Sequence, residues 1–424
     1  MFKPIIRTFS TNNKESVVII GTGWGGFRLL QHLDKKKYDV TVVSPRNHFV
    51  FTPLLASSAV GTIEYRCIAA PVRDFKDSAT YYEGYAREID TQKKILHCDK
   101  PSAQGKFSLK YDKLVIACGA APNTFGTPGV YENAFFLKEI ADARNIRYRV
   151  IDRFELASDP CTSEEEKAAL LHFAVVGGGP TGIELSAELH DFLKYDVAKL
   201  YPKLKPYAKL SVYDVAEKIL GSFDSRLREY ATKKFWRDGT EIKTGTKIQE
   251  VKKDRLVLAD KSEIRVGMVV WATGLTANPF ITSLPFFKDK SKRLLVDQFL
   301  HVLEGENHEA VKDVYALGDC ATIEHYNLPQ TAQVANQQAN YLAKELNKYA
   351  NSPAPFTYHH KGAMAYVGDY KAVLDTKEVK GRGITAWIFW RSANWTMTVS
   401  WKNKILIRMY WTITWLFGRD TSRF

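Results

Sequence analysis

Short apolar runs rich in β-branched residues end in glycine at several places along this chain. Val17–Ile20 leads into Gly21, and Phe173–Val176 leads into Gly177. In both places the residues after the glycines have apolar positions at helical spacing, so the pattern predicts a strand, a tight turn and a helix. Two copies of a βαβ unit are therefore expected, each with the G-x-G-x-x-G spacing typical of dinucleotide-binding folds.

Three further strands that end in glycine follow in an informative order. They are Leu114–Ala120, Met268–Gly274 and Val314–Asp319. Leu114–Ala120 follows the first βαβ unit, and Met268–Gly274 follows the second. Val314–Asp319 comes later in the chain and has an acidic residue at its end. This order predicts an α/β fold in which one nucleotide domain is interrupted by the insertion of another.

The glycines of the two turns have distinct physical tasks. The first glycine permits the tight turn, the second lets the backbone approach a pyrophosphate, and the third lets the helix pack closely on the strand. The N–H groups and the dipole of the helix N-terminus then face the anion. The glycines in these positions are Gly21, Gly23 and Gly26 in the first βαβ unit and Gly177, Gly179 and Gly182 in the second.

The residues after the next strand of each unit bear on recognition of the ribose. In the second βαβ unit Leu210–Tyr213 ends at Asp214, whose carboxylate suits a ribose diol and repels a 2′-phosphate. This favours NADH over NADPH, although Asp214 lies 37 residues after Gly177, further than the usual spacing of about 20. In the first βαβ unit Ser44 and Arg46 stand at the corresponding place, where a hydroxyl can bind ribose and a guanidinium can pair with phosphate.

Composition narrows the class of protein. A chain of 424 residues with 45% hydrophobic and 25% charged residues is long enough for two or three globular domains. Its five cysteines are scattered and never form a CxxC pair, which argues against a disulfide framework, a zinc site or a dithiol redox motif. No metal site is therefore expected, and a reducing compartment fits best.

The net charge of +13 is concentrated near the C-terminus. Residues 380–424 carry eight basic residues against one acidic residue, together with six of the nine tryptophans. Basic residues interrupt every apolar run, so none reaches the ~20 residues that a spanning helix needs. Ile405, Met409, Ile413 and Leu416, with Trp401 a turn earlier, predict one apolar helical face suited to the surface of a membrane. The other tail tryptophans are expected to supply rings of the kind favoured at that interface: Trp387, Trp390, Trp395, Trp411 and Trp415. An aromatic packing seam in the core or a dimer interface is the alternative interpretation.

The first fifteen residues have the composition of a mitochondrial presequence. They include Lys3, Arg7 and several hydroxyl residues, with no acid before Glu15 and no secretory apolar core. A short tail before the first strand is the alternative interpretation.

Specific segments give the chain a close resemblance to a known family. Besides the two glycine turns, these are Val43–Asn47 leading into Phe51–Leu55, Gly178–Glu184, Ala316–Asp319 and Ala332–Gln337. Together they resemble the type II, or alternative, NADH:quinone oxidoreductases over nearly the whole chain after about Ser16. The resemblance implies noncovalent FAD on the first Rossmann unit, NADH on the second, and attachment to one membrane leaflet through the C-terminal segment.

The resemblance also implies roles for individual residues. Thr52, Pro53 and Leu54 would lie along the isoalloxazine, and Asp319 would accept a hydrogen bond from a hydroxyl of FAD. Catalytic roles fall on Glu184 near nicotinamide and flavin, on Gln333 and Gln337 beside a quinone slot, and on Lys361 near flavin and quinone. The other positions expected to contact cofactors are Cys118, Gly119, Gly318 and Gly274.

Two departures from the family pattern stand out. Cys118-Gly119-Ala120 replaces an Ala-Thr-Gly-like segment, and Asn336 occupies a place often held by histidine in fungal and plant relatives, which puts a proton relay there in doubt. There is also no EF-hand loop, so calcium control is not expected.

The expected domain organisation follows from the resemblance. Residues 1–15 form a possible targeting segment, residues 16–130 and 283–365 an FAD domain, residues 131–282 an NADH domain and residues 366–424 a membrane-attachment region. We expect a homodimer, peripheral on the matrix face of the mitochondrial inner membrane, that oxidises NADH and reduces a quinone, with ubiquinone expected, without pumping protons.

Two other classes of function remain open from the residues. A sulfide:quinone oxidoreductase shares the architecture but needs redox cysteines beside the flavin, for which Cys161 and Cys320 are the candidates. An NADH-sensing flavoprotein would instead bind nucleic acid or partners through the basic, aromatic tail. The lipid solubility of a quinone favours a membrane surface for that tail, and no nucleic-acid partner is expected.

Overall fold

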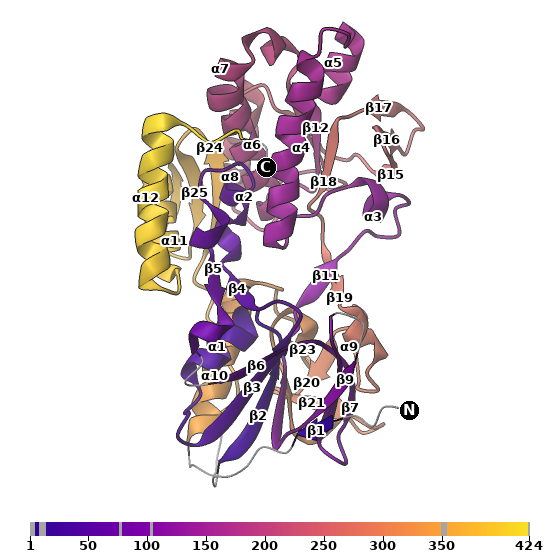
Figure 1. The fold of residues 1–424 in the computed structure, drawn as a ribbon, viewed down its shortest axis with the longest axis vertical. Coiled ribbons are helices and arrows are strands. Elements are labelled where there is room, and N and C mark those ends of the chain that lie inside the picture. Colours follow the sequence, from indigo (N-terminus) through magenta and orange to yellow (C-terminus); the bar gives the residue numbers. More distant parts are fainter. Residues whose placement is uncertain (1–4, 8–13, 76–78, 102–104, 349–353, 423–424) are drawn as a thin grey trace. The chain divides into compact units, whose positions relative to one another are not determined.

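The computed structural model describes residues 5–7, 14–75, 79–101, 105–348 and 354–422 (Figure 1). The chain divides into two compact units, each assembled from segments distant in the sequence. Unit 1 comprises Met1–Phe49, Ala70–Ala121 and Leu275–His360; unit 2 comprises Val50–Ala69, Pro122–Gly274 and Lys361–Phe424. These units are defined by packing, and the nucleotide assignment of the expected domains remains a prediction.

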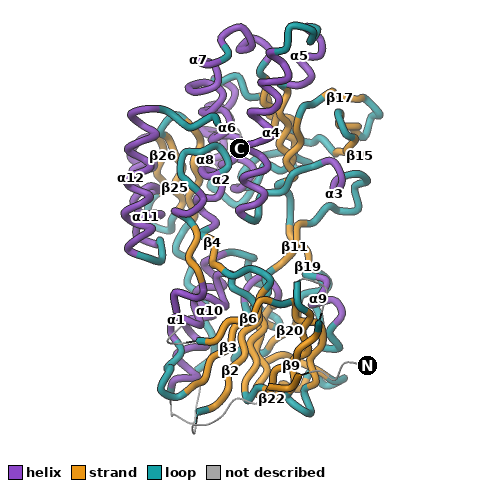
Figure 2. The backbone as a smooth tube through the Cα atoms, viewed as in Figure 1, coloured by secondary structure: helices purple, strands orange, loops and turns teal. Residues whose placement is uncertain are grey.

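Unit 1 is built on an eight-stranded sheet, visible as strands in Figure 2. Its order is β23 (Ala321–Ile323), β20 (Leu294–Val296), β21 (His301–Glu304), β22 (Glu309–Ala316), β10 (Lys113–Ile116), β2 (Glu15–Ile20), β3 (Tyr38–Ser44) and β6 (Thr80–Glu83). The five strands from β22 to β6 run parallel. Val17–Ile20 and Leu114–Ile116 are buried in it, as expected for parallel strands covered on both faces.

Two helices of unit 1 pack against each other. They are α1 (Trp24–His32) and α10 (Ala332–Asn347), and the Arg28 Nε donates to the Asn340 Oδ1 at 3.1 Å. A glycine turn precedes α1, and Thr331 caps the N-terminus of α10 by accepting a hydrogen bond from the Val334 N–H. A shorter helix, α9 (Pro279–Ser283), also belongs to this unit.

A second sheet of unit 1 includes part of the predicted targeting segment. Its order is β1 (Ile5–Arg7), β9 (Lys106–Lys110), β8 (Ile95–Asp99) and β7 (Tyr85–Asp90), with β1 parallel to β9. Residues 1–4 and 8–13 lie outside the described residues. Whether residues 1–15 act in targeting stays a prediction.

Unit 2 contains the second parallel sheet. Its order is β14 (Glu241–Lys243), β13 (Lys209–Tyr213), β12 (His172–Val176) and β18 (Met268–Trp271). The helices around it are α3 (Val130–Asn133), α4 (Ile140–Ser158), α5 (Glu164–Leu170), α6 (Pro180–Phe192), α7 (Ala198–Leu200) and α8 (Ser225–Arg237). Since α6 begins directly after the glycine turn that follows β12, both predicted Rossmann units are confirmed.

Two antiparallel sheets complete unit 2. One has β15 (Ile248–Lys252), β16 (Arg255–Leu258) and β17 (Glu263–Arg265); the other has β24 (Ala363–Gly368), β25 (Lys371–Asp375) and β26 (Lys380–Gly383). The helix α2 (Leu55–Ser58) packs on α6, and α6 packs on β24. The short strands β4 (His48–Val50), β5 (Ala69–Pro71), β11 (Ala120–Pro122) and β19 (Leu275–Ala277) lie near the sequence boundaries of the units.

The C-terminal segment of unit 2 forms two helices. They are α11 (Ile384–Met397) and α12 (Trp401–Phe417), and α11 packs on β25 and β26. Within the described ranges, no helix combines the length and the apolar character needed to cross a bilayer.

Candidate functional site

The first glycine turn of unit 1 leaves space for a ligand at one position only. Gly21 has φ of +107°, and a Cβ at Gly21 would collide with the backbone of Ala117. A Cβ at Gly26 would collide with the Gly21 carbonyl oxygen, so helix and strand need glycine there. Gly23, at the N-cap of α1, has nothing within 4 Å of an added Cβ, so the turn is open where a pyrophosphate would bind.

The turn of unit 2 repeats this arrangement. Gly177 has φ of +121°, and an added Cβ there or at Gly182 would meet backbone atoms. Gly179 is the N-cap of α6 and again has nothing within 4 Å of an added Cβ. Each turn therefore combines two positions that packing restricts to glycine with one that faces open space.

Unit 1 brings its predicted FAD residues to one edge of the sheet. The strands β22, β10, β2 and β3 are adjacent and parallel, so the residues after their carboxyl ends share an edge. These residues are Gly318 and Asp319, Cys118 and Gly119, the turn of Gly21, and Ser44 with Arg46. The arrangement matches the position of a dinucleotide at the carboxyl ends of a doubly wound sheet.

Side chains at this edge also hold the loops in place. The Ser44 hydroxyl accepts a hydrogen bond from the Arg46 N–H at 3.1 Å and lies 3.1 Å from the Thr22 hydroxyl. The Gly318 N–H donates to the Gln338 Oε1 at 2.8 Å. Sequence reasoning missed Gln338, which is 2% exposed; its neighbourhood in the glutamine-rich Ala332–Gln338 run was the available indication.

The two glutamines predicted to border a quinone slot lie on α10. Gln337 forms two hydrogen bonds with the backbone of His359: its Nε2 donates to the carbonyl at 2.8 Å, and its Oε1 accepts from the N–H at 3.0 Å. Gln333 Oε1 accepts from the Tyr358 hydroxyl at 3.3 Å. Both amides therefore contact the segment around Tyr358 and His359, and their quinone roles stay predictions.

Glu184 occupies a polar niche within unit 2. Its Oε1 accepts hydrogen bonds from the Tyr366 N–H and from the Trp390 Nε1, each at 3.1 Å. Burial raises the pKa of Glu184 to about 8, despite the opposing effect of these two donors. The carboxyl group therefore carries a proton over much of the neutral range. Neither Tyr366 nor Trp390 could be assigned from the sequence, because their contacts join β24 and α11 to α6.

The remaining predicted residues of unit 2 are dispersed along it. Thr52, Pro53 and Leu54 form one turn of 3-10 helix, in which Leu54 is fully buried and Thr52 is exposed. Lys361 is exposed just before β24, and Gly274 follows β18 and accepts a hydrogen bond from the Asn123 N–H through its carbonyl.

Asp214 lies at the carboxyl end of β13 and is bonded to the glycine turn itself. Its Oδ2 accepts from the Gly178 N–H, and its Oδ1 accepts from the Ala216 N–H at 2.7 Å. The carboxylate therefore shapes the turn in addition to the predicted contact with ribose.

The comparisons with known proteins agree on one family. Residues 15–339 match the family model described as pyridine nucleotide-disulphide oxidoreductase, and residues 360–420 match the NDH2 C-terminal domain. A relative named probable NADH dehydrogenase, from Dictyostelium discoideum, is 42% identical; the match covers 97% of this chain and 91% of that protein. The chain belongs to the type II NADH dehydrogenase family.

Two further relatives agree with this assignment. The internal alternative NAD(P)H-ubiquinone oxidoreductase A1 of Arabidopsis thaliana mitochondria is 40% identical, over 97% of this chain and 86% of that protein. The solved structure of NDH2 from Plasmodium falciparum in complex with NADH superimposes with a TM-score of 0.91 at 27% identity, over 96% of this chain and 100% of that chain. The family predicted from the sequence is thereby confirmed, whereas the roles of single residues stay predictions.

In this type II NADH dehydrogenase, Asp214→Asn should narrow the preference for NADH over NADPH. An amide does not repel a 2′-phosphate. It also places an NH2 donor where one of the two carboxylate oxygens accepts, so the hydrogen bond from either the Gly178 N–H or the Ala216 N–H is lost. We expect the KM for NADH to rise several-fold while that for NADPH changes less. Steady-state rates with both nucleotides measure this.

A matched control uses Asp260→Asn, because Asp260 also accepts from a backbone N–H two residues on, but in an exposed turn. It should leave both KM values unchanged. Equal wild-type rates with NADH and NADPH would show that Asp214 does not distinguish the ribose of NADH from the 2′-phosphorylated ribose of NADPH.

Glu184→Gln should change the pH dependence of stability. The ordinary pKa of a glutamate side chain is 4.5, and the pKa of Glu184 in the folded protein is about 8. At pH values between these two, the folded protein keeps a proton on Glu184 that the unfolded chain has lost. The free energy of unfolding therefore falls as pH rises through this window, by at most roughly 1.4 kcal/mol per pH unit. Glutamine keeps an acceptor for both donors and does not ionise, so the variant should gain stability relative to wild type toward the upper end of the window.

Denaturant unfolding at the two ends of the window measures this gain. Glu88→Gln, at an exposed position in unit 1, is the control and should change stability little at either pH. A difference between wild type and Glu184→Gln that is independent of pH would contradict the shifted pKa.

Proposed function

We propose that this type II NADH dehydrogenase oxidises NADH and reduces a membrane quinone, of the ubiquinone class, to quinol through noncovalent FAD and without pumping protons. The observation that carries the proposal is the pair of glycine turns, each open at the N-cap of the helix after a parallel strand. NADH and ubiquinone come from the printed names of the relatives and of the solved complex.

The residues of unit 1 fit FAD. An added Cβ at Gly23 would fill the space in front of α1, and Asp319 and Gly119 follow strands that end at the same edge. Unit 2 offers the matching space at Gly179, with Asp214 beside it for the ribose of NADH.

Bound FAD would supply the redox chemistry by accepting a hydride from NADH and passing two electrons to the quinone. The polypeptide would bind and orient the flavin, NADH and the quinone. In the proposal Asp214 accepts hydrogen bonds from the ribose diol of NADH, and Glu184 keeps a proton on its carboxyl group. The amide groups of Gln333 and Gln337 donate hydrogen bonds to a quinone carbonyl. Thr52 to Leu54 and Lys361 are proposed to border the flavin.

An exposed apolar face on the C-terminal helices supports peripheral attachment to a membrane. The predicted face of α12 is exposed throughout: Trp401, Ile405, Met409, Ile413 and Leu416 all lie at the surface. Ile384, Ile388 and Phe389 add exposed apolar area from α11. We also propose that the protein lies on the matrix face of the mitochondrial inner membrane and forms a homodimer. The molar mass of the protein in detergent tests for the dimer.

The expectation that the tail tryptophans all lie at the membrane interface is wrong for two of them. Trp390 is 6% exposed and donates to Glu184, and Trp411 is 8% exposed. The Arg391 guanidinium lies 4.1 Å from the centroid of the Trp411 ring. Trp390 therefore joins α11 to α6, and Trp411 joins α12 to α11.

Making the exposed face polar should release the protein from membranes. Ile405→Gln combined with Phe417→Gln removes side chains that are 65% and 82% exposed, so folding should persist. We expect binding to anionic liposomes to weaken roughly tenfold, measured by co-sedimentation. Trp236→Gln with Leu200→Gln, at exposed apolar positions outside α11 and α12, is the control. Equal retention of the two double variants on liposomes would contradict a role of α12 as a membrane anchor.

The two alternative function classes gain no support from the structure. The Cys320 thiol is buried and donates to the carbonyl oxygens of Ile116 and Leu317, which gives it a packing role in unit 1. The basic residues of the tail lie beside tryptophan rings, as with Lys404 and Trp401 at 5.0 Å, an arrangement that suits a membrane interface as well as bases.

One assay tests the proposed function directly. The purified yellow protein should consume NADH slowly alone and rapidly when a short-chain quinone is added. In proteoliposomes the same turnover should produce no pH gradient. Failure of the quinone to accelerate NADH consumption by the flavin-loaded protein would overturn the proposal.

A further inference from the structure

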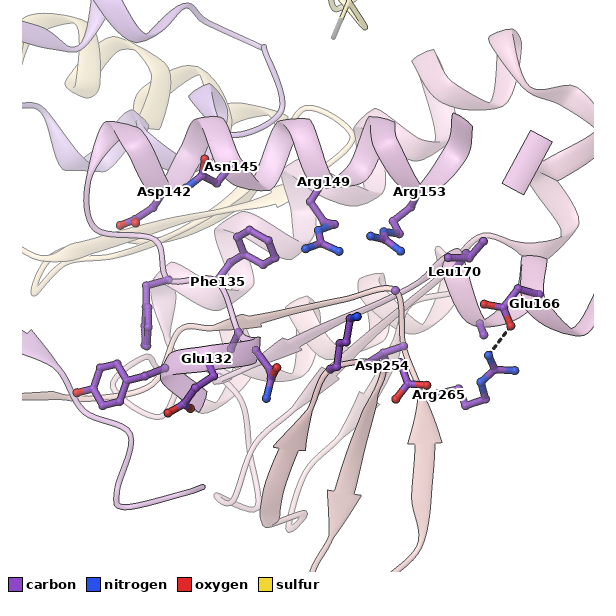
Figure 3. Close-up of a pocket in the computed structure, with 18 residues that line it drawn as sticks. Glu132, Phe135, Asp142, Asn145, Arg149, Arg153, Glu166, Leu170, Asp254 and Arg265 are labelled. Atoms are coloured by element: carbon purple, nitrogen blue, oxygen red, sulfur yellow. Dashed lines mark hydrogen bonds and ion pairs between the residues drawn. The ribbon is translucent and has the colours of Figure 1, made fainter. Parts of the chain in front are cut away.

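A large cavity in unit 2 lies at the opposite end of the parallel sheet from the glycine turn. Its volume is about 820 Å³, and it is bounded by α4, by residues 131–136 and by Leu170 and Gly267, which precede β12 and β18 (Figure 3). Gly177 and Asp214 follow the carboxyl ends of β12 and β13. A strand of five residues spans roughly 16 Å, so this cavity is separate from the dinucleotide turn.

Two arginines of α4 face this cavity. Arg149 and Arg153 are four residues apart, and Figure 3 shows both side chains directed from the helix toward the cavity. Arg149 forms no ion pair with any described residue, and its guanidinium lies 5.2 Å from the centroid of the Phe135 ring. Like charges at this spacing on a helix repel each other, so the pair is unfavourable without a nearby anion.

Arg153 is only partly compensated. Its one ion pair is with the adjacent Asp152, at 3.3 Å, and its Nε is buried without a hydrogen-bond partner. Burial and then the charge of Arg149 lower the pKa of Arg153, and the charges of Asp152 and Glu166 only partly oppose this effect. The Arg153 guanidinium therefore has a buried donor without an acceptor and only partial compensation of its charge.

Most acids around the cavity are engaged elsewhere. Glu166 is paired with Arg265, and Asp142 accepts from the N–H groups of Lys138 and Glu139 in the cap of α4. Glu132 lies at the other end of the cavity from Arg153 (Figure 3). Asp254, the fourth lining acid, is paired with Arg255. Among the described residues, no carboxylate that lines the cavity forms an ion pair with Arg149 or Arg153.

The aromatic wall is fixed by the sheet. The Phe135 N–H donates to the Val269 carbonyl at 2.8 Å, and the Trp271 N–H donates to the Phe135 carbonyl at 2.7 Å, so Phe135 extends the edge of β18. A flat apolar ring beside guanidinium groups suits a ligand that has both an aromatic ring and phosphate groups. The volume is within the range of about 300–1,000 Å³ usual for small-molecule sites.

We propose that this cavity is a second ligand site, which binds a phosphate-bearing aromatic compound of nucleotide size. Its phosphates lie between Arg149 and Arg153, and its ring lies against Phe135. The site is independent of the dinucleotide turn and of the redox reaction.

Isothermal titration of the FAD-loaded enzyme tests the site, with ADP and inorganic pyrophosphate as probes and saturating NAD⁺ present to occupy the dinucleotide turn. Wild type should bind one molecule of either probe per chain, with ADP the tighter. The double variant Arg149→Gln with Arg153→Gln should weaken the binding of both probes by roughly tenfold or more. Arg144→Gln, at an exposed position of the same helix, is the matched control and should bind as wild type does.

Phe135→Leu is a second and milder variant. It should weaken the binding of ADP and leave the binding of pyrophosphate unchanged. Melting temperature and flavin content confirm that each variant is folded. Absence of binding by wild type at millimolar probe, or equal binding by wild type and the double arginine variant, would overturn the proposal. So would loss of binding in Gly179→Val with binding kept in the arginine variant, since the probes would then occupy the dinucleotide turn.

Discussion

Gly23→Val should yield a folded but colourless protein. The backbone of Gly23 has φ of −77°, which any residue adopts, and nothing lies within 4 Å of an added Cβ. The polypeptide therefore tolerates valine, whereas the methyl groups would occupy the space that the pyrophosphate of FAD needs. We expect complete loss of bound flavin and of NADH oxidation, with the circular dichroism spectrum unchanged.

Gly179→Val is the matched variant, because Gly179 is likewise an N-cap with an open Cβ direction, in unit 2. It should keep FAD and lose NADH affinity. Gly26→Ala should behave differently from both, since its Cβ would collide with the Gly21 carbonyl and the protein should fail to fold. Flavin is measured by absorbance and by chromatography of the extracted cofactor. A yellow Gly23→Val protein would refute FAD binding at this turn.

The glycine turns could be predicted because the information for them is local. An apolar strand, three glycines at fixed spacing and a helix are read within one short segment, and the structure has them at β2–α1 and β12–α6. The apolar face of α12 could be predicted for the same reason, since its residues recur at spacings of three and four.

Contacts between distant segments could not be predicted in this way. Trp390 donates to Glu184 across 206 residues, and the Asp224 N–H donates to the Asp375 carboxylate, 151 residues away. Tryptophans in an amphipathic tail look alike in the sequence, whether they face lipid or, like Trp390, a buried carboxyl group. The cavity beside Arg149 was missed because its lining comes from five separate segments of unit 2.

The C-terminal segment after α12 holds a buried ion-pair cluster that sequence reasoning also missed. The Arg419 guanidinium lies 2.8 Å from the Asp196 carboxylate and 3.4 Å from the Glu188 carboxylate, and its Nε donates to the Thr62 hydroxyl at 2.8 Å. The Glu188 side chain is 5% exposed and also accepts from the hydroxyls of Ser57 and Thr62. Burial acts to lower the pKa of Arg419, but the charges of Glu188 and Asp196 outweigh it and raise that pKa.

Arg419→Gln should therefore destabilise the protein strongly. It removes the cation between two carboxylates that are 5% and 8% exposed, and breaking a buried pair in this way costs about 3–5 kcal/mol. Arg408→Gln, at an exposed position of α12, should cost less than roughly 0.5 kcal/mol. Urea unfolding followed by tryptophan fluorescence measures both.

A second variant separates loss of charge from loss of packing. Adding Glu188→Gln to Arg419→Gln should recover part of the loss, because one uncompensated charge is removed while the hydroxyls of Ser57 and Thr62 keep an acceptor. A deficit that Glu188→Gln does not recover would show that Arg419 acts through packing and not as the counter-ion of Glu188 and Asp196.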